Sequence, residues 1–384
     1  MRNIVISHTN YKNFGGEDSN FLEETKILSE KFSVFKLQFS NREKINLFDI
    51  FGFFTNSNFK SNNKFKEILN SSQIDLFYVH NLWFKGNLKL LKIANKQNIQ
   101  TVVKIHNFRY LCANSYFSDN HVKKNQICNA CGYKGRGVFK FNKYFSNSFF
   151  KSFLVIWHTK KMLKMLNQYP IKILLISNQH IQDIKKHVSN NKNLYKIYNP
   201  ISISRNLNKY NHKSDYVVYA GRVTSEKGIF DLIDNWKQFK KENMELRILG
   251  EVEQKLSLDL KNFEKDIKIY GYINLDKTLE QISNARALIL PTLLYEGQPR
   301  VLCEAAALGV PSIFPNFGSL KELFSDDYLL KYRQFNNLDF MSKLNLLHDE
   351  KIMIDSSEMV LRFSKEYFSK EVIVKKFIEI VNDK

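Results

Sequence analysis

The sequence is short of the residues that mark small disulfide-rich proteins, and it has no long apolar run. Its 384 residues include only four cysteines, six prolines and 14 glycines. Four cysteines in a chain of this length do not make a disulfide framework, which favours a reducing compartment. Apolar runs such as residues 153–157 are far shorter than the roughly 20 residues of a bilayer-spanning helix. The apolar stretch at the N-terminus is too short for a signal peptide, so we expect a cytoplasmic protein.

Acidic residues are scarce beside basic ones. The chain has 58 lysines and arginines against 38 aspartates and glutamates, a net charge of +20. This excess predicts an anionic partner: a nucleotide, a phospholipid surface or a nucleic acid. The lysines are spread along the chain and no RNA-binding or helix-turn-helix signature is present, so we expect no nucleic-acid partner. The length and an apolar content of 43% predict two packed domains.

The most informative stretch is residues 287–324. An apolar run, residues 287–290, predicts a buried strand, a helical pattern spans about 300–308, and a second strand follows at 312–314. Glu296 in the loop and Glu304 in the helix flank the helix start, where free backbone N–H groups attract phosphate. Each carboxylate suits a pair of neighbouring hydroxyls, which fits a sugar nucleotide. The alternative is a solvated Glu296 and an exposed Glu304.

A basic loop follows the strand predicted at residues 216–220. Arg222 and Lys227 lie in this loop. An arginine makes forked contacts to phosphate oxygens and a lysine places a point charge there, so the loop is a candidate diphosphate site. A solvated loop is the alternative.

The N-terminal half has two further candidates at predicted strand ends. Gly15 and Gly16 lie between a strand at 4–7 and a helix, where glycine lets the backbone approach a ligand. His106 follows the strand predicted at 101–105, at the sheet edge where reactive groups collect. A hydrogen-bonded structural histidine is the alternative for His106.

Two further segments each allow two interpretations. Cys112, Cys128 and Cys131, with His121, could bind zinc. Only one closely spaced pair is present, which favours a stapled or reduced loop and no metal. In residues 139–167, lysines alternate with large apolar side chains. That pattern suits a helix on an anionic membrane surface, and equally a core helix with solvated lysines.

Two of these stretches resemble the signatures of the retaining glycosyltransferases of family four, which have the GT-B fold. The family pattern is Glu, seven residues, Glu, an alanine-rich helix, Gly and Pro, together with Gly-Arg, three residues, Glu-Lys-Gly. Here the matching residues are Glu296, Glu304, Ala305, Ala306, Ala307, Gly309 and Pro311, and Gly221, Arg222, Glu226, Lys227 and Gly228. The resemblance implies an α/β protein with two Rossmann-like parallel-sheet domains. Residues 1–199, with a returning helix at about 365–384, would bind acceptor, and residues 200–364 would bind donor.

The resemblance also implies roles for individual residues. The catalytic residues would be His106, Glu296, Arg222 and Lys227. The donor-binding residues would be Gly15, Gly16, Arg222, Lys227, Gly250, Glu296, Gly297, Gln298, Arg300, Val301 and Glu304. The fixed positive charges would stabilise the leaving diphosphate, so no metal or other cofactor is required. One departure is Gln298-Pro299, where many members carry an aromatic residue and glycine; this leaves the donor nucleotide open between UDP and GDP.

The function implied is transfer of a sugar from a nucleotide-diphosphate sugar to a saccharide or polyprenyl-linked acceptor. The expected setting is bacterial surface polysaccharide synthesis: O-antigen, capsule or exopolysaccharide. Because many family members use lipid-linked acceptors, the resemblance favours peripheral contact with the inner face of an anionic membrane. The alternatives are a nucleotide-sugar epimerase of the same fold and a basic nucleic-acid- or membrane-binding protein without catalysis.

Overall fold

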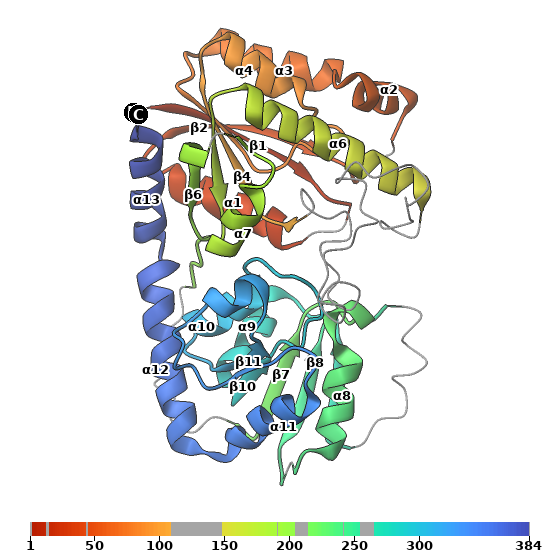
Figure 1. Ribbon diagram of the computed structural model, residues 1–384, viewed down its shortest axis with the longest axis vertical. Helices are drawn as coiled ribbons and strands as arrows, with labels where there is room; N and C mark the ends of the chain where they lie inside the picture. The colour runs from red at the N-terminus through yellow and green to blue at the C-terminus, as the bar shows by residue number, and fades with distance from the viewer. Residues whose placement is uncertain are drawn as a thin grey trace. The chain divides into compact units, whose positions relative to one another are not determined.

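The computed structural model describes residues 2–12, 15–43, 45–108, 148–189, 191–203, 214–240, 242–253 and 265–383. The chain folds into two compact units. One contains Ile201–Ser369, and the other contains the described residues before Ile201 together with Lys370–Lys384. Each unit has its own parallel sheet (Figure 1).

The first unit has a six-stranded sheet in the order β2-β1-β3-β4-β5-β6, with every neighbouring pair parallel. Parallel sheets are covered on both faces, which is why the central strands read as nearly continuous apolar runs. Leu76, Phe77, Tyr78 and Val79, for example, are at most 1% exposed. The strands are β1 (Asn3–Asn10), β2 (Ser33–Ser40), β3 (Leu76–Val79), β4 (Gln100–Ile105), β5 (Ile171–Leu175) and β6 (Leu194–Lys196).

Helices cover both faces of this sheet. Figure 1 shows α3, α4 and α6 on one face and α1 on the other, where α13 also packs. Asn46, Asn58 and Ser148 start α2, α3 and α6 by accepting a backbone N–H three residues on, as side-chain N-caps do. The helices are α1 (Gly16–Leu28), α2 (Leu47–Thr55), α3 (Phe59–Ser71), α4 (Lys89–Lys96), α6 (Phe149–Gln168), α7 (Asn178–Ile184) and α13 (Lys370–Asn382).

The second unit has another six-stranded parallel sheet, in the order β12-β11-β10-β7-β8-β9. Its strands are β7 (Tyr216–Ala220), β8 (Glu245–Leu249), β9 (Ile267–Gly271), β10 (Ala287–Ile289), β11 (Ser312–Pro315) and β12 (Lys331–Tyr332). Its α-helices are α8 (Ile229–Gln238), α9 (Leu275–Asn284), α10 (Arg300–Ala307), α11 (Asn337–Asn345) and α12 (Glu350–Tyr367). The predicted α/β class with two parallel Rossmann-like sheets is confirmed.

The strand orders locate the candidate sites. Starting from its first strand, the chain builds each sheet in one direction and then reverses to build the other half. The reversal lies between β1 and β3 in the first unit and between β7 and β10 in the second. Ligands of open α/β sheets bind beyond the carboxyl ends of the strands at such a switch point.

One expectation from the sequence needs adjustment. Residues 41–63 are polar and aromatic with no clear period, which predicts a loop with one short helix, but the structure has α2 there and the start of α3. The sequence signal was weak because α2, with the sequence LFDIFGFFT, lacks the polar face by which a surface helix is recognised. Among the described helices, none is both long enough and apolar enough to cross a membrane.

Candidate functional site

The loops after β7 and β10 meet at the switch point of the second unit, because the two strands are paired neighbours. There the ammonium of Lys227 donates to Oε1 of Glu296. The hydroxyl of Thr292 donates to the same oxygen over 3.1 Å. Both partners of the ion pair stay partly open to solvent, with exposed side-chain fractions of 20% for Lys227 and 18% for Glu296. The structure therefore brings these two predicted residues into contact at an accessible position.

The backbones of the two loops are also joined. The N–H of Leu293 donates to the carbonyl of Glu226 over 3.1 Å. Gly228 adopts φ +73°, and a Cβ there would lie 2.0 Å from the carbonyl oxygen of Pro291. Only glycine allows both the left-handed conformation and this approach. Gly228 thus holds the Lys227 loop against the Glu296 loop.

Gly250 has a similar role at the end of β8. Its φ is +143°, and a Cβ there would lie 1.8 Å from the carbonyl oxygen of Gly221. Gly221 in turn donates its N–H to the carbonyl of Leu249 over 2.9 Å. Close backbone packing therefore already requires glycine at 250, independently of any ligand.

The start of α10 carries a second charged pair. Nε of Arg300 donates to Oε1 of Glu304 over 2.7 Å. Glu304 is 5% exposed, so the alternative of a solvated helix face is wrong. Pro299 is the N-cap and provides no side-chain cap, which leaves the first backbone N–H groups of the helix without that partner.

The remaining residues predicted in this unit surround these pairs. Arg222 is exposed, and its carbonyl accepts from the hydroxyl of Tyr219 over 2.6 Å. Gly297, Gln298 and Val301 are half-buried, in the loop before α10 and in its first turn. Cys303, in the same helix, is buried, and burial raises the pKa of its thiol to about 12.

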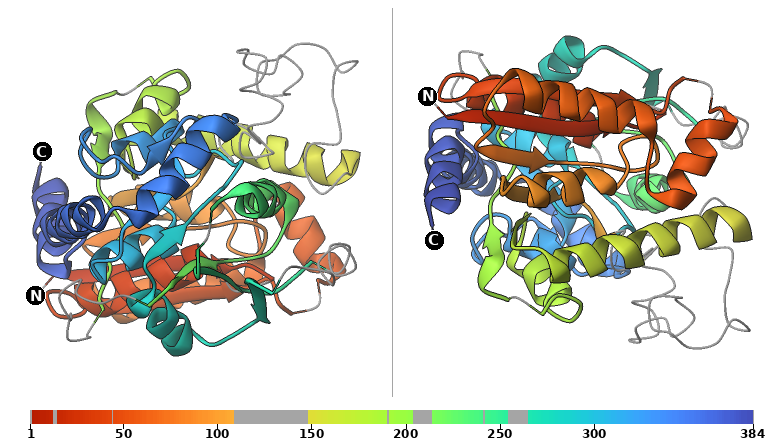
Figure 2. Two further views of the ribbon diagram at one scale, coloured as in Figure 1. Left: turned by 90° about the horizontal axis from the view of Figure 1, so that it is seen from below. Right: turned by 90° about the horizontal axis from the view of Figure 1, so that it is seen from above.

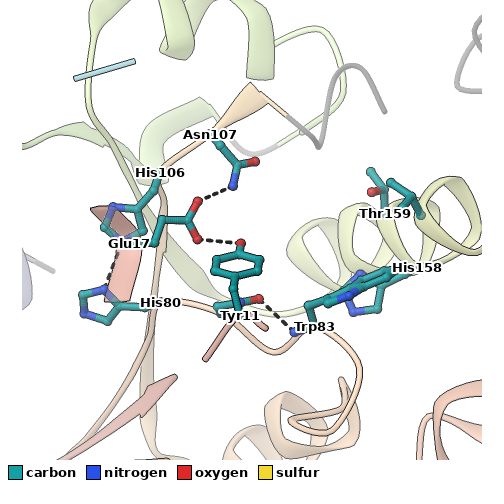
Figure 3. A pocket seen from close by; sticks show the side chains of 10 residues that line it. Tyr11, Glu17, His80, Trp83, His106, Asn107, His158 and Thr159 are labelled. Carbon is teal, nitrogen blue, oxygen red and sulfur yellow. Dashed lines mark hydrogen bonds between the residues drawn. The ribbon is translucent and has the colours of Figure 1, made fainter. Parts of the chain in front are cut away.

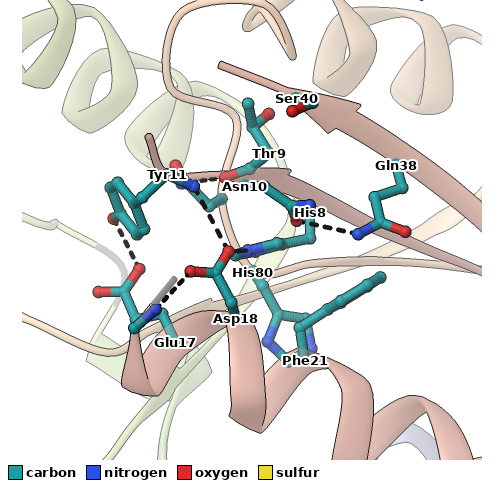
Figure 4. Close-up of polar contacts among 12 residues, drawn as sticks. His8, Thr9, Asn10, Tyr11, Glu17, Asp18, Phe21, Gln38, Ser40 and His80 are labelled. Atoms are coloured by element: carbon teal, nitrogen blue, oxygen red, sulfur yellow. Dashed lines mark hydrogen bonds and ion pairs between the residues drawn. The ribbon is translucent and has the colours of Figure 1, made fainter. Parts of the chain in front are cut away.

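In the first unit, Gly15 and Gly16 lie at the start of α1. The N–H of Gly15 donates to Oδ2 of Asp18 over 2.9 Å. Oδ1 of Asp18 lies 3.0 Å from Nε2 of His8 (Figure 4). A Cβ at Gly16 would meet nothing within 4 Å. In this unit the loop is therefore held by Asp18, and packing does not require glycine at 16.

His106 lines a pocket at the carboxyl edge of the first sheet (Figure 3). Glu17 lines it too, and its two oxygens accept from the hydroxyl of Tyr11, over 2.6 Å, and from the amide of Asn107. His158 of α6 lines the pocket too, and burial lowers its pKa to about 3. The pocket thus presents a carboxylate, an amide and neutral imidazoles, which are hydrogen-bonding groups suited to sugar hydroxyls.

A buried network lies behind His106. The carboxylate of Glu24, 2% exposed, accepts from the hydroxyl of Tyr78 over 2.5 Å and from the ammonium of Lys104. Nε2 of His80 lies 3.7 Å from the same carboxylate. Burial, followed by nearby positive charge including that of Lys104, lowers the pKa of His80 and of His106 well below the ordinary range. Both imidazoles are therefore neutral at physiological pH.

Comparison with known proteins agrees with this geometry. Residues 201–355 match the family described as Glycosyl transferases group 1. The amylovoran biosynthesis glycosyltransferase AmsD of Erwinia amylovora is 29% identical over 222 residues, covering 54% of this chain and 62% of AmsD. The match thus spans less than two thirds of that relative. Residues 201–355 therefore belong to the group 1 glycosyltransferase family.

Solved structures place this family member in the GT-B fold. HepE of Anabaena, crystallised with UDP and glucose, superposes with a TM-score of 0.64 at 13% identity, over 99% of both chains. The lipopolysaccharide outer core galactosyltransferase WaaB, in its apo form, gives 0.64 at 18% identity, also over 99% of both chains. The predicted family and fold are confirmed.

Sequence reasoning missed most of the network behind His106 in this group 1 chain. A signal existed for His80, which ends a predicted strand just as His106 does. No signal marked Lys104, which lies in a strand and is 0% exposed, because lysines are abundant and solvated elsewhere in the sequence. Glu24 was equally hidden, within an ordinary helical pattern.

The candidate zinc ligands Cys112, Cys128, Cys131 and His121 lie outside the described residues. Among the residues that the structure does describe, no cluster of His, Cys, Asp or Glu could hold a metal ion.

Proposed function

We propose that this protein is a retaining glycosyltransferase that moves a sugar from a UDP-sugar to a saccharide or polyprenyl-linked saccharide during bacterial surface polysaccharide synthesis. The observation that carries the proposal is the Lys227–Glu296 pair at the switch point between β7 and β10. The relatives support it: AmsD is named for exopolysaccharide synthesis and WaaB for the lipopolysaccharide outer core. The UDP in the HepE complex favours UDP over GDP.

In this proposal the second unit binds the donor. Arg222 and Lys227 hold the diphosphate, helped by the backbone N–H groups at the start of α10. Glu304 accepts from the two ribose hydroxyls and Glu296 from hydroxyls of the transferred sugar. The buried position of Glu304 supports its role, since a carboxylate held by Arg300 has one fixed direction in which to accept.

When the donor binds, the ion pair between Lys227 and Glu296 can be exchanged for contacts with the donor. Without donor, each charge satisfies the other at a partly exposed position. A bound donor offers both a better partner: phosphate oxygens for the ammonium and sugar hydroxyls for the carboxylate. Binding then replaces one ion pair by two sets of charge-assisted hydrogen bonds, and Thr292 keeps the carboxylate in place throughout.

The first unit binds the acceptor in the pocket lined by His106, and its Gly15–Gly16 loop contributes to donor binding. The acceptor oxygen attacks the sugar on the face that the diphosphate leaves, and its proton passes to the departing phosphate oxygen. Negative charge grows on that phosphate, where Arg222 and Lys227 stabilise it, so these side chains supply the charge for which other transferases need a metal ion. His106 orients the reacting sugar by one hydrogen bond.

The test is release of UDP from a panel of UDP-sugars, with and without saccharide or polyprenyl-linked acceptors, in the presence of EDTA. Lys227→Ala and Glu296→Gln should each lower kcat on the order of 10²–10³-fold, the usual cost of one group that stabilises developing charge. Lys277→Ala, an exposed lysine in α9, is the matched control and should keep the wild-type rate.

Two outcomes would overturn the proposal. Full activity of the Lys227→Ala and Arg222→Ala variants would show that the diphosphate lies elsewhere. UDP release that is identical with and without every acceptor, with formation of free or epimerised sugar, would favour a nucleotide-sugar epimerase.

A further inference from the structure

The helix α2 is apolar on the side that faces solvent. Its inner side packs through Gly52 and Phe53, which are buried. Its outer side carries Leu47, Phe48 and Phe51, whose exposed fractions are 82%, 85% and 68%. A helix that packs on a globular unit through one apolar face normally has polar residues on its solvent face. When the solvent face is apolar too, that face is normally buried against a partner.

The start of α6 extends this apolar surface. The ring of Trp157 in α6 lies 5.8 Å from the ring of Phe54 in α2. Phe153 and Phe150 precede Trp157 by four and seven residues, so all three share one face of the helix. Phe150 is 61% exposed and Phe153 is 49% exposed.

Both views of Figure 2, like Figure 1, show α2 beside the start of α6 at one end of the first unit. We call this surface the aromatic face; it consists of Leu47, Phe48, Phe51, Phe54, Phe150, Phe153 and Trp157.

The exposed charge on the two helices that carry the aromatic face is of one sign. α2 and α6 contain four lysines, all in α6, and a single acidic residue, Asp49. Asp49 is 7% exposed and turns inward to Asn58 and Lys85. The ammonium of Lys161 lies 3.5 Å from the ring centre of Trp157. The aromatic face therefore has the lysines of α6 beside it, and its two helices carry no exposed carboxylate.

We propose that the aromatic face lies in the headgroup region of an anionic lipid bilayer and holds the enzyme on the membrane surface. Aromatic and leucine side chains on one side of a short helix enter the headgroup and acyl boundary, and lysines beside them attract anionic lipids. Exposed apolar side chains that are scattered singly are ordinary, but a group of them on two adjacent helices marks an interaction site. The exposed charge beside the face is positive, so an anionic bilayer attracts it. A second copy of this chain, with its own net charge of +20, would repel it.

The experiment measures binding of the full chain to sedimented vesicles, with no substrate present. Vesicles of phosphatidylcholine alone are compared with vesicles that contain phosphatidylglycerol, at low and high salt. The wild-type chain should bind the anionic vesicles at least ten-fold more strongly, and salt should weaken that binding. Phe48→Ser/Phe51→Ser should lose at least ten-fold in binding. Both side chains are exposed, so the fold should survive, as circular dichroism would check.

The matched control is Tyr272→Ser/Leu338→Ser. These side chains are 80% and 85% exposed, in the second unit, and their removal should leave vesicle binding unchanged. Brominated lipid should also quench Trp157, an effect that Trp157→Phe would abolish.

Equal loss of binding in the control, or no binding of the wild type to anionic vesicles, would overturn the proposal. So would a dimer in light scattering that Phe48→Ser/Phe51→Ser dissociates, because the face would then join two copies. None of these readouts depends on sugar transfer.

Discussion

Nδ1 of His80 lies 2.9 Å from Nε2 of His106. Both rings are neutral, so one proton lies between these atoms. The carboxylate of Glu24, 3.7 Å from Nε2 of His80, favours a proton on that nitrogen and leaves Nδ1 of His80 as the acceptor. His106 therefore donates from Nε2, and its Nδ1, which has no hydrogen-bond partner within the structure described, keeps a free lone pair. In this tautomer Nδ1 of His106 can only accept a hydrogen bond.

The first prediction concerns His80 as a positioning residue. His80→Phe removes the acceptor for His106, so the imidazole is free to change tautomer. We expect kcat for sugar transfer to fall about 10- to 100-fold, as for other residues that orient a functional histidine, with the donor KM unchanged. His80→Gln, whose amide oxygen can accept, should recover part of the loss. Equal rates for Phe and Gln at this position would contradict the role.

The second prediction concerns the buried pair of Glu24 and Lys104. Glu24→Gln leaves the ammonium of Lys104, which is 0% exposed, without its carboxylate. We expect the free energy of unfolding to fall by about 3–5 kcal/mol. Urea denaturation would measure the loss. Glu24→Gln/Lys104→Met should recover most of it, and a double variant no more stable than the single one would contradict the pairing.

The third prediction concerns Gly228. In Gly228→Ala the new methyl group would overlap the carbonyl of Pro291, 2.0 Å away, at a φ of +73°. The loops of Lys227 and Glu296 must then separate, so we expect a large loss of both stability and donor binding. Gly16→Ala is the control, because its Cβ would meet nothing within 4 Å. Thermal unfolding should show a shift of several degrees for Gly228→Ala only, and similar shifts in both variants would refute the explanation.

The fourth prediction is that stability falls in mild acid because of buried histidines. Burial lowers the pKa of His180 from 6.5 to about 3. Below pH 6.5 the unfolded chain binds a proton there that the folded chain does not. The free energy of unfolding should therefore fall as pH drops from 6.5 towards 3, by up to about 1.4 kcal/mol per pH unit for each such histidine.

His180→Phe isolates this contribution. Neither ring nitrogen of His180 has a hydrogen-bond partner in the described structure, and the ring packs on Phe108 with a centroid distance of 4.3 Å. Phenylalanine should fit in this place. The slope of the unfolding free energy against pH between 6 and 4 should then decrease by the contribution of one histidine, up to about 1.4 kcal/mol per pH unit. An unchanged slope would show that His180 takes up its proton in the folded state too.

Local pattern was enough for part of the second unit. Residues 216–220 were predicted with the bounds that β7 has, because an apolar run acts within a few residues of the chain. The spacing of Glu296 and Glu304, and of Arg222 and Lys227, was visible for the same reason. Both pairs lie on single loop-and-helix segments, so the sequence by itself indicated the family and a set of candidate side chains.

Tertiary structure alone decided which side chains meet. Gly228 needs to be glycine because of Pro291, and Lys104 is buried because Glu24 lies beside it; no local pattern records such distant partners. The solvent side of α2 is likewise a property of packing, since the sequence LFDIFGFFT reads the same whether its phenylalanines are buried or exposed. Segment type follows from interactions between near neighbours, whereas burial and pairing depend on contacts that form only when distant segments fold together.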